Sequence, residues 1–384
     1  MKKAFVTIFP PFEEVHLYKD VGMIPRYMAS EHGYQSYILS NNSCVMDEEL
    51  FHSVECKLIN ESNDKINCVT SSSYNIFEML IFLRNISTKY DKVVVNLYHF
   101  HPKHIILSFL IKVLFSNVFT YIKLDITSEG AKQLFNNSKV YKKHIRDFLL
   151  GFVDVFSAET MQAFSYLKQK ANISDKTYLI PNGVFLNKES MGLNKIGLLS
   201  KKEKFIFSAG RLESYPKNTK LMVDSFLKSE LWKDGWQLIL AGSYDQELQK
   251  YINEQTKIKL SKYDEAIFLV GHLNRDELYS YMRRAKVFSL SSRWEGFALV
   301  LPEAVAHGCI IAATDVGGVA DVTNMGALGF IAKEQTVDSF TDVLKSAAAS
   351  DPSLGKKQMD FGISNFDWKT ICDKLDKVLN EKTK

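Results

Sequence analysis

Short apolar runs alternate with longer amphipathic segments along most of this 384-residue chain. The first examples are an apolar run at residues 4–9, a helical pattern over residues 23–32 and a second apolar run at 35–39. A strand, a helix and a second strand in this order pack most simply as a parallel sheet covered by helices. The alternation therefore predicts an α/β fold built on parallel sheets.

The alternation forms two series, separated by a pause at Pro181-Asn182-Gly183-Val184. Before the pause, further strands are predicted at residues 92–97, 118–122, 153–158 and 177–180. After the pause, strands are predicted at 205–209, 237–241, 266–270, 287–290 and 310–314, with helices led by 218–226, 246–254, 275–284 and 299–307. Because one hydrophobic core seldom serves more than about 300 residues, we expect an N-terminal domain at 1–183 and a C-terminal domain at 184–365.

The charge balance excludes one class of partner. The net charge of +4 arises from 48 Lys and Arg residues against 44 Asp and Glu, and it is shared evenly between the two halves. Neither half has the basic excess of a nucleic-acid-binding domain, so we expect no nucleic acid partner. One stretch departs from the balance, because five basic residues occur there without an acid: Lys132, Lys139, Lys142, Lys143 and Arg146. The stretch fits either a solvated helix face or a contact with an anionic membrane or acceptor.

Cysteine usage and apolar run length bear on the compartment. The five cysteines are scattered and lack any C-x-x-C spacing, which favours reduced thiols, a cytoplasmic setting and no zinc site. The N-terminal apolar run is too short for a signal peptide and fits a first buried strand. The longest apolar stretch, residues 105–119, carries Lys112 and is shorter than the roughly 20 residues that span a bilayer. We expect a buried or surface-lying helix there, and a cytoplasmic protein that can lie peripherally on the inner face of the membrane.

The segment 291–308 reads S-S-R-W-E-G-F-A-L-V-L-P-E-A-V-A-H-G and carries the clearest chemistry. A strand is predicted to end near Leu290, and a helix to begin close to Leu299, because Pro302 is tolerated only in a first helical turn. Such a helix start at the carboxyl end of a strand suits a phosphate or sugar hydroxyls. Glu295 on the turn and Glu303 on the helix can accept hydrogen bonds from hydroxyls at two places on one ligand.

This segment resembles the signature of the large retaining glycosyltransferase family 4, which has the GT-B fold. In that family, the first of two glutamates separated by seven residues contacts the donor sugar, and the second contacts the ribose diol. The resemblance assigns these roles to Glu295 and Glu303. It also implies that backbone groups after the first glutamate contact the sugar and the phosphates, at Gly296, Phe297, Ala298 and Leu299.

Further matches to the same family follow its order and cover most of residues 180–370. They are the loop 208–218, I-P-N-G-V at 180–184, the Gly-Gly segment at 315–321 and F-x-W at 366–368. The resemblance implies two Rossmann-like domains facing a central cleft. It also implies a C-terminal helix at 366–384 that crosses back to the N-terminal domain.

The loop 208–218 places Arg211 and Lys217 after a predicted strand and after Gly210. Transfer from a nucleotide sugar expels a nucleoside diphosphate, and preplaced cations stabilise the negative charge that develops on the leaving phosphate. Arg211 can clamp a phosphate bidentately, and Lys217 can act as a mobile point charge. We therefore predict that Arg211, Lys217 and Glu295 carry the catalysis.

Other donor contacts and the independence from metal follow from the resemblance. Base contacts are expected from backbone near Gly242 and Gly271, and Gly22 occupies the place of the family's glycine-rich first loop. No Asp-x-Asp pair stands at a predicted strand end, so we expect the helix start, Arg211 and Lys217 to replace a divalent metal. We expect no cofactor beyond the nucleotide-sugar substrate, and we nominate no covalent nucleophile.

The N-terminal half is expected to hold the variable acceptor. The family often has a histidine after its fifth strand, where this chain has Lys123 and Asp125, which fit either a substitute for it or a strand-end charge pair. His99 and His101 are candidates for contact with the acceptor or the donor sugar. Together with His104 they fit no helical zinc motif, and the rim of a polar cleft is the better interpretation.

Two rival functions require motifs that the sequence lacks. A nicotinamide dehydrogenase needs G-x-G-x-x-G after its first strand, and a P-loop nucleotidase needs G-x-x-x-x-G-K-[ST]; neither motif is present there. A GT-B epimerase or phosphorylase, or a non-catalytic sugar-nucleotide-binding subunit, remains an alternative. We predict a transferase that uses a UDP-sugar, with a GDP-sugar second, and a glycan or lipid-linked acceptor in surface polysaccharide or glycoconjugate assembly.

Overall fold

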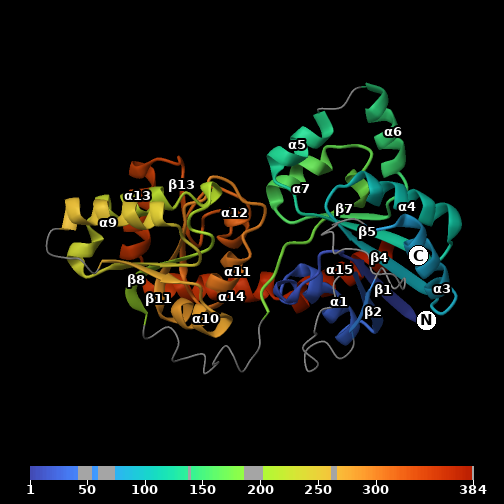
Figure 1. Cartoon of the computed structure of the whole chain (residues 1–384), viewed down its shortest axis with the longest axis horizontal. Helices are drawn as coiled ribbons and strands as arrows, with labels where there is room; N and C mark the ends of the chain where they lie inside the picture. The colour runs from blue at the N-terminus through green and yellow to red at the C-terminus, as the bar shows by residue number, and fades with distance from the viewer. Residues whose placement is uncertain (42–53, 59–73, 137–139, 186–201, 261–265, 383–384) are drawn as a thin grey trace. The chain divides into compact units, whose positions relative to one another are not determined.

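A computed structural model describes residues 1–41, 54–58, 74–136, 140–185, 202–260 and 266–382 (Figure 1). The chain forms two compact units. Unit 1 contains Met1–Phe185 together with Trp368–Lys384, and unit 2 contains Leu186–Asp367. Each unit holds one parallel sheet with helices on both faces, as the alternation in the sequence predicts.

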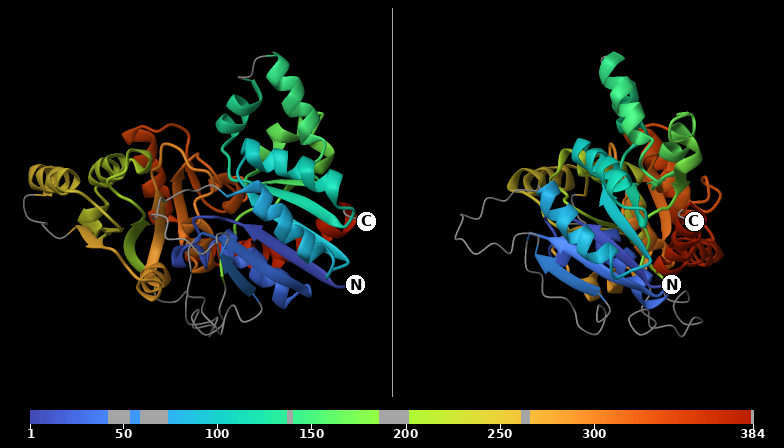
Figure 2. Two further views of the ribbon diagram at one scale, coloured as in Figure 1. Left: turned by 45° about the vertical axis from the view of Figure 1, so that its right-hand side comes forward. Right: turned by 90° about the vertical axis from the view of Figure 1, so that its right-hand side faces the viewer.

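The sheet of unit 1 has seven strands in the order β3-β2-β1-β4-β5-β6-β7, and all neighbouring pairs are parallel. Figure 2 shows these strands side by side, with both chain termini in the same unit. The strands are β1 (Lys3–Ile8), β2 (Tyr34–Ser40), β3 (Val54–Leu58), β4 (Lys92–Tyr98), β5 (Val118–Leu124), β6 (Val155–Ala158) and β7 (Thr177–Leu179). The helices are α1 (Asp20–Ser30), α3 (Ile76–Ser87), α4 (Pro102–Leu114), α5 (Ser128–Asn136), α6 (Val140–Leu150), α7 (Met161–Lys168) and α15 (Trp368–Lys382), with 3₁₀ turns at Glu14–His16 and Ser174–Lys176.

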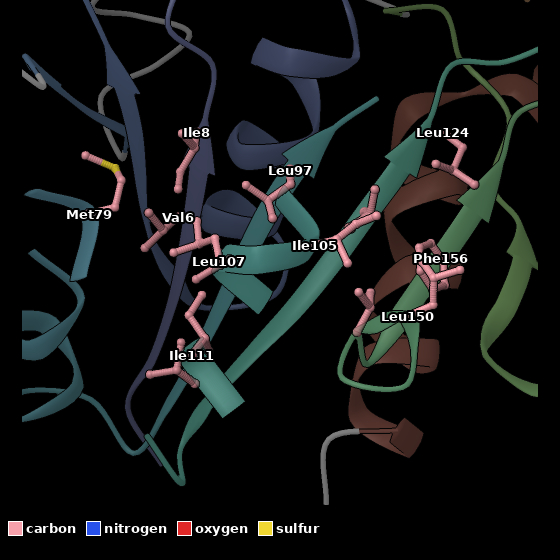
Figure 3. Packing of buried hydrophobic residues seen from close by; sticks show 14 of the residues in the cluster. Val6, Ile8, Met79, Leu97, Ile105, Leu107, Ile111, Leu124, Leu150 and Phe156 are labelled. Carbon is pink, nitrogen blue, oxygen red and sulfur yellow. The ribbon is translucent and has the colours of Figure 1, made fainter. Parts of the chain in front are cut away.

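Both faces of this sheet are buried, because parallel strands joined by helical crossovers are covered on each side. On one face, Val6, Ile8 and Leu97 pack against Leu107 and Ile111 of α4 (Figure 3). Side chains alternate between the faces along a strand, so the residues between these point to the other side. On that second face the strands pack against α1 and α15, through a cluster that includes Phe5, Val94, Met23, Trp368 and Leu375.

The sheet of unit 2 has six parallel strands in the order β10-β9-β8-β11-β12-β13. The strands are β8 (Glu203–Ala209), β9 (Gln237–Ala241), β10 (Ile267–Gly271), β11 (Ala285–Leu290), β12 (Ile310–Thr314) and β13 (Phe330–Ala332). The helices are α8 (Thr219–Ser229), α9 (Gln246–Leu260), α10 (Arg275–Arg284), α11 (Val300–Ala306), α12 (Val319–Val322), α13 (Val337–Ala349) and α14 (Pro352–Phe366), with 3₁₀ turns at Tyr215–Lys217 and Leu231–Asp234.

The two sheets share one topological property. In unit 1 the strand order reverses between β1 and β4, and in unit 2 it reverses between β8 and β11. At such a reversal, the loops that follow the two strands leave in opposite directions and open a crevice at their carboxyl ends, where ligands of α/β proteins bind. The loops after β1 and β4, and those after β8 and β11, are therefore the positions to search for sites.

The prediction of two Rossmann-like parallel sheets is confirmed, but two strands were missed and one helix was predicted too long. The edge strands β3 and β13 were not predicted. The apolar stretch 105–119 is not one helix, because α4 ends at Leu114 and β5 begins at Val118. Phe115 adopts an extended conformation between them and ends the helix. No helix in the described part of the chain is long and apolar enough to cross a membrane.

Candidate functional site

Lys217 and Glu295 meet at the reversal point of unit 2. Lys217 follows β8 and Glu295 follows β11, and their Nζ and Oε1 atoms are 2.6 Å apart. Ser292 Oγ donates to the same Oε1 at 2.6 Å. Both charged side chains are largely buried, at 22% and 16% exposure, so the pair is less screened by solvent than a surface pair. Among the described residues, nothing else engages the two remaining N–H donors of Lys217 or the second carboxylate oxygen of Glu295.

Backbone contacts hold the two loops together. Ser291 Oγ donates to the carbonyl oxygens of Lys217 and Asn218, at 3.0 and 3.2 Å, and Arg293 N–H donates to Pro216 at 2.7 Å. Asn218 has left-handed backbone angles, which asparagine tolerates better than most residues. The sequence Pro216-Lys217-Asn218 thus forms a 3₁₀ turn and then reverses into α8, which fixes the direction of Lys217.

Glycines allow the strand ends of unit 2 to approach one another closely. Gly242, after β9, has a φ of 122°, and a Cβ there would lie 1.8 Å from the carbonyl oxygen of Gly210. Gly210 N–H donates to Ala241 at 3.0 Å, and Gly242 N–H donates to Gly271 at 2.7 Å. Three of the predicted donor residues therefore lie together at the carboxyl ends of neighbouring strands: Gly210, Gly242 and Gly271.

The segment after Glu295 presents backbone rather than side chains. The side chains of Phe297 and Ala298 are buried in the core of unit 2. Gly317, after β12, packs so closely that a Cβ there would lie 2.6 Å from the oxygen of Gly296. Among the described residues, the N–H groups of residues 296–299 donate no backbone hydrogen bond, and α11 begins next, at Val300. This arrangement leaves a short row of N–H donors beside Glu295.

Glu303 lies on α11 with its carboxylate 18% exposed. Tyr279 OH donates to its Oε1 at 3.3 Å, and Arg275 Nη2 lies 3.9 Å from the same atom. Burial raises the pKa of Glu303, and the positive charge of Arg275 and the hydrogen bond from Tyr279 oppose that rise. The carboxylate is thus held in a dry position by partners on α10.

Arg211 is exposed at the end of β8, and no described residue pairs with its guanidinium. Trp294, which precedes Glu295 in the chain, is also exposed, and its ring lies 5.7 Å from that of Tyr215. A cavity of about 310 Å³ adjoins this loop, but three of its lining residues are the acids Glu213, Asp245 and Glu247. Lys220 and Arg293 also line this cavity, but the three acids outnumber them, so a diphosphate fits better on the side of the loop where Lys217 lies.

The candidate residues of unit 1 separate into a surface group and an interior group. His99 and His101 are exposed at the end of β4 and line a cavity of about 380 Å³. Asp125 is exposed after β5. Gly22 lies inside α1, where a Cβ would be 2.2 Å from the carbonyl oxygen of Leu17, so the glycine serves a close backbone approach there.

Lys123 is fully buried on β5 and therefore does not face a ligand. Its ammonium pairs with Glu159, which follows β6, and lies 3.6 Å from Asp20 at the start of α1. Burial raises the pKa of Glu159, and Lys123 opposes that rise. Sequence reasoning missed Glu159. The available signal was that Glu159 directly follows a buried strand, β6, which lies next to the strand that carries Lys123.

The basic residues of the stretch 132–146 differ in their surroundings. Arg146 of α6 is turned inward, where its Nη1 donates to Leu134 at 2.8 Å and its Nη2 lies 2.9 Å from Asp147. Lys132 is exposed on α5, and Lys139 lies outside the described residues. In the described part of the chain, no group of three or more His, Cys, Asp or Glu side chains is arranged to hold a metal ion.

Comparison with known proteins points to one family. Residues 193–381 match the family model of glycosyl transferases group 1. The chain is 28% identical over 42% of its length to the lipopolysaccharide core biosynthesis mannosyltransferase LpsB of Rhizobium meliloti, covering 48% of that protein. It is 25% identical over 62% of its length to an N-acetylgalactosaminyltransferase of Campylobacter jejuni whose name specifies a diphospho-undecaprenol acceptor, covering 63% of that protein. The chain thus spans about half the length of the curated relatives it matches.

Solved structures match over almost the whole chain. A glycosyltransferase from Rickettsia africae superposes with a TM-score of 0.71 at 16% identity, covering 100% of this chain and 99% of that one. HepE from Anabaena, in complex with UDP and glucose, superposes with a TM-score of 0.65 at 13% identity, covering 99% and 100%. Likeness at such identities establishes the fold, while the match over residues 193–381 establishes the family. The chain therefore has the GT-B fold, and its residues 193–381 belong to the family of glycosyl transferases group 1.

Proposed function

We propose that this chain transfers a sugar from a nucleoside diphosphate sugar to a hydroxyl of a glycan or lipid-linked acceptor, with retention of anomeric configuration and without a metal ion. The observation that carries the proposal is the Lys217–Glu295 pair at the reversal point of unit 2. It unites a cation for the leaving phosphate and a carboxylate for the sugar in one place.

Lys217 has the role of stabilising the departing diphosphate. Its ammonium donates once to Glu295, which holds it in position, and two donors remain for phosphate oxygens. Arg211 adds a second cation that needs no rearrangement to meet a phosphate, since no described residue engages it. Because charge on the leaving oxygen grows during bond cleavage, preorganised cations lower the barrier rather than only strengthening binding.

The two glutamates contact the donor at different places. The free oxygen of Glu295 accepts from a sugar hydroxyl, and the N–H groups of residues 296–299 donate to the sugar or its phosphate. Glu303 accepts from the ribose diol, with Tyr279 and Arg275 keeping its carboxylate in place. The acceptor hydroxyl bonds to the anomeric carbon on the face from which the diphosphate leaves, and a diphosphate oxygen takes its proton, so configuration is retained without a covalent intermediate.

Several relatives favour a uridine nucleotide and a lipid-linked acceptor. One Escherichia coli relative, 28% identical over 44% of this chain, is named as a UDP-Gal galactosyltransferase for a diphosphoundecaprenol acceptor. The HepE structure holds UDP. These names describe those proteins, and they make UDP-sugars the first donors to try here.

A binding panel tests the donor assignment. Thermal stability of the purified chain would be recorded with UDP, GDP and ADP, and with UDP-sugars, in the presence and absence of a chelator. We expect UDP to raise the melting temperature and the chelator to leave that rise unchanged. If none of these nucleotides stabilises the protein, the proposal is wrong.

We also propose peripheral contact with an anionic membrane surface, through α4 and α6 of unit 1. These helices pack together and expose Val113, Leu114, Ile145 and Phe148, each more than half accessible. Residues 102–152 also contain eight Lys and Arg residues against three acids. Apolar side chains among positive charges suit an anionic bilayer surface.

Sedimentation with lipid vesicles tests the membrane face. We expect the protein to sediment with vesicles that contain anionic lipid, and Phe148→Ser to reduce the bound fraction several-fold through lost apolar burial. The exposed Phe77→Ser on α3 serves as a control for apolar loss elsewhere on the unit. Equal sedimentation with anionic and zwitterionic vesicles would rule out the proposed contact.

A further inference from the structure

Unit 1 has a cavity at its own reversal point, formed by the loops after β1 and β4. Its volume is about 380 Å³, and we call it the unit 1 pocket. It occupies the position in the sheet of unit 1 that the Lys217–Glu295 pair occupies in unit 2. Ligands of parallel α/β sheets bind at such positions.

One residue that lines the unit 1 pocket, His99, has an unusual backbone conformation. His99 has a φ of 64°, a left-handed conformation that few residues other than glycine adopt. Two contacts hold it there, since His99 N–H donates to Lys123 O at 2.9 Å and His104 Nδ1 lies 3.1 Å from His99 O. Strain maintained in this way is typical of ligand-binding sites.

The hydrogen bonds define which ring nitrogens face a ligand as donors or acceptors. His104 Nδ1 donates to a carbonyl, and burial lowers the pKa of His104 to about 4, so its Nε2 keeps a lone pair that can accept. His101 Nδ1 accepts from the N–H of Lys103 at 3.2 Å, so the Nε2 of His101 carries a proton that can donate. The pocket therefore presents complementary polar groups from neighbouring histidines.

The charge of the unit 1 pocket favours an anion. Lys103 lines it at the start of α4, a helix of thirteen residues whose amino end carries a positive dipole. The first-turn N–H groups are already used, because His101 caps Lys103 N–H and its carbonyl accepts from His104 N–H. Binding of an anion thus depends on the Lys103 ammonium and the His101 donor. None of the described residues lining the pocket is acidic.

A second feature points to a missing partner. Tyr74 also lines the pocket, is 6% exposed, and has a hydroxyl without a hydrogen-bond partner among the described residues. Its ring stacks on His104, with centroids 5.9 Å apart and planes 6° from parallel. A buried hydroxyl without a partner is costly, and a bound ligand would supply one.

The remaining wall of the pocket is apolar, formed by Phe9, Pro10, Pro11 and Tyr98. A cation, several polar groups and an apolar wall together match a molecule that carries both a phosphate and an apolar face. We propose that the unit 1 pocket binds the acceptor through a phosphate-bearing group, with Lys103 and His101 on the phosphate and Tyr74 and His104 on a neighbouring hydroxyl. This inference rests on the proposed transfer function and names the class of its acceptor.

Calorimetric titration of the full chain with glucose 1-phosphate and with free glucose tests the soluble form of this chemistry. UDP is present at saturation, so that a sugar phosphate cannot occupy the phosphate site of unit 2. A second arm compares vesicles with and without a polyprenyl phosphate. We expect phosphate-dependent binding in one arm, and the arm that shows it distinguishes a soluble sugar phosphate from a lipid-linked acceptor.

Matched variants assign that binding to the unit 1 pocket. Lys103→Met should weaken it about tenfold or more, as expected for loss of a charge-assisted hydrogen bond. Lys89→Met removes the same charge from an exposed lysine that follows α3, outside both the pocket and the proposed membrane face, and should have less than a twofold effect. Tyr74→Phe should weaken binding about fivefold while leaving thermal stability unchanged or higher, because the buried hydroxyl has no partner to lose.

Three results would overturn the proposal. The first is equal affinity for glucose and glucose 1-phosphate without phosphate-dependent binding to vesicles. The second is phosphate-dependent binding that Lys103→Met and Lys89→Met weaken equally. The third is absence of binding in both arms by a protein that still binds UDP, which would refute the acceptor assignment while leaving the donor assignment intact. Failure to bind UDP in its own titration would instead count against the proposed function.

Discussion

Glu303 combines a functional role with a cost to stability. Its carboxylate is largely buried, and burial raises its pKa. A carboxyl whose pKa is higher in the folded state than in the unfolded state destabilises the fold once it is ionised, so this cost is present at pH values above both pKa values and disappears as the pH falls below them. The proposed contact with the ribose diol gives a reason for a carboxylate at this costly position.

Replacing Glu303 should therefore separate binding from stability. In Glu303→Gln, the amide still accepts from Tyr279, and the buried charge is removed. We expect UDP affinity to fall about tenfold, discrimination between UDP and 2′-deoxy-UDP to disappear, and the free energy of unfolding at pH 7 to rise. Calorimetry and denaturant titration measure these quantities. Unchanged discrimination would show that another group reads the ribose.

His307 should make unit 2 sensitive to acid. It is 4% exposed, its Nδ1 lies 2.7 Å from Glu303 O, and its Nε2 is buried without a partner among the described residues. Burial lowers its pKa to about 4, so between pH 6.5 and 4 the unfolded state binds the proton and the folded state does not. Stability should fall as the pH drops through that window, by up to about 3 kcal/mol from this residue.

Denaturant titrations at several pH values check this expectation. His307→Gln cannot bind the proton in either state, so its unfolding free energy should decline less between pH 6.5 and 4 than that of the unmodified protein. Parallel pH profiles for the two proteins would mean that His307 does not control the acid sensitivity.

At the scale of elements, the close packing of the loops after β8 and β9 in unit 2 depends on glycines that allow backbone contact. Gly242→Ala places a methyl group 1.8 Å from Gly210 O at a φ of 122°, so the loop after β8 has to move. We expect a loss of about 2 kcal/mol or more in stability and loss of UDP binding. Gly235→Ala is the matched control, because its φ is also positive, at 79°, with nothing within 4 Å of the added carbon.

The Gly235 variant should be mildly destabilised and should bind UDP normally, as measured by denaturant titration and calorimetry. If both variants bind UDP equally well, the contact between Gly210 and Gly242 does not shape the donor site.

Sequence patterning predicted most elements and missed those with weak local signals. The strand at Ile310–Thr314 is a continuous run of apolar and β-branched residues and was predicted with its bounds. The strand β13 has only three residues, and β3 carries Glu55 and Lys57 at a sheet edge, so neither shows a buried run. The start of the strand at Val118 was predicted, but the helix before it was extended to residue 119 instead of Leu114, because both elements are apolar there.

The sequence was more informative about unit 2 than about unit 1, for a physical reason. Lys217 and Glu295 stand in compact motifs directly after strands, so their proximity could be predicted from the parallel topology. The unit 1 pocket draws on Pro10, Tyr74 and His104, which are far apart in the chain and carry no shared motif. Lys123 was predicted either to replace the family's histidine or to belong to a strand-end charge pair, and its burial with Glu159 emerges only when β5 and β6 are paired.

On the scale of the whole molecule, the same strand order occurs twice, and each reversal point carries polar groups suited to a phosphate. Unit 2 presents Lys217 and Glu295 there, and unit 1 presents Lys103 and His101. A transferase needs both a donor and an acceptor, and the two sites supply one position for each. The proposed function should therefore be tested with a donor site in unit 2 and an acceptor site in unit 1.

The most direct measurement is acceptor-dependent release of nucleoside diphosphate from a UDP-sugar. The comparison is between the unmodified chain, Lys217→Met and Lys220→Met, since Lys220 is an exposed lysine of α8 that pairs with Glu247. We predict release by the unmodified chain and by Lys220→Met. We predict that Lys217→Met lowers turnover by about a hundredfold or more, as for loss of a preorganised group that stabilises transition-state charge. Full turnover by Lys217→Met would contradict the account.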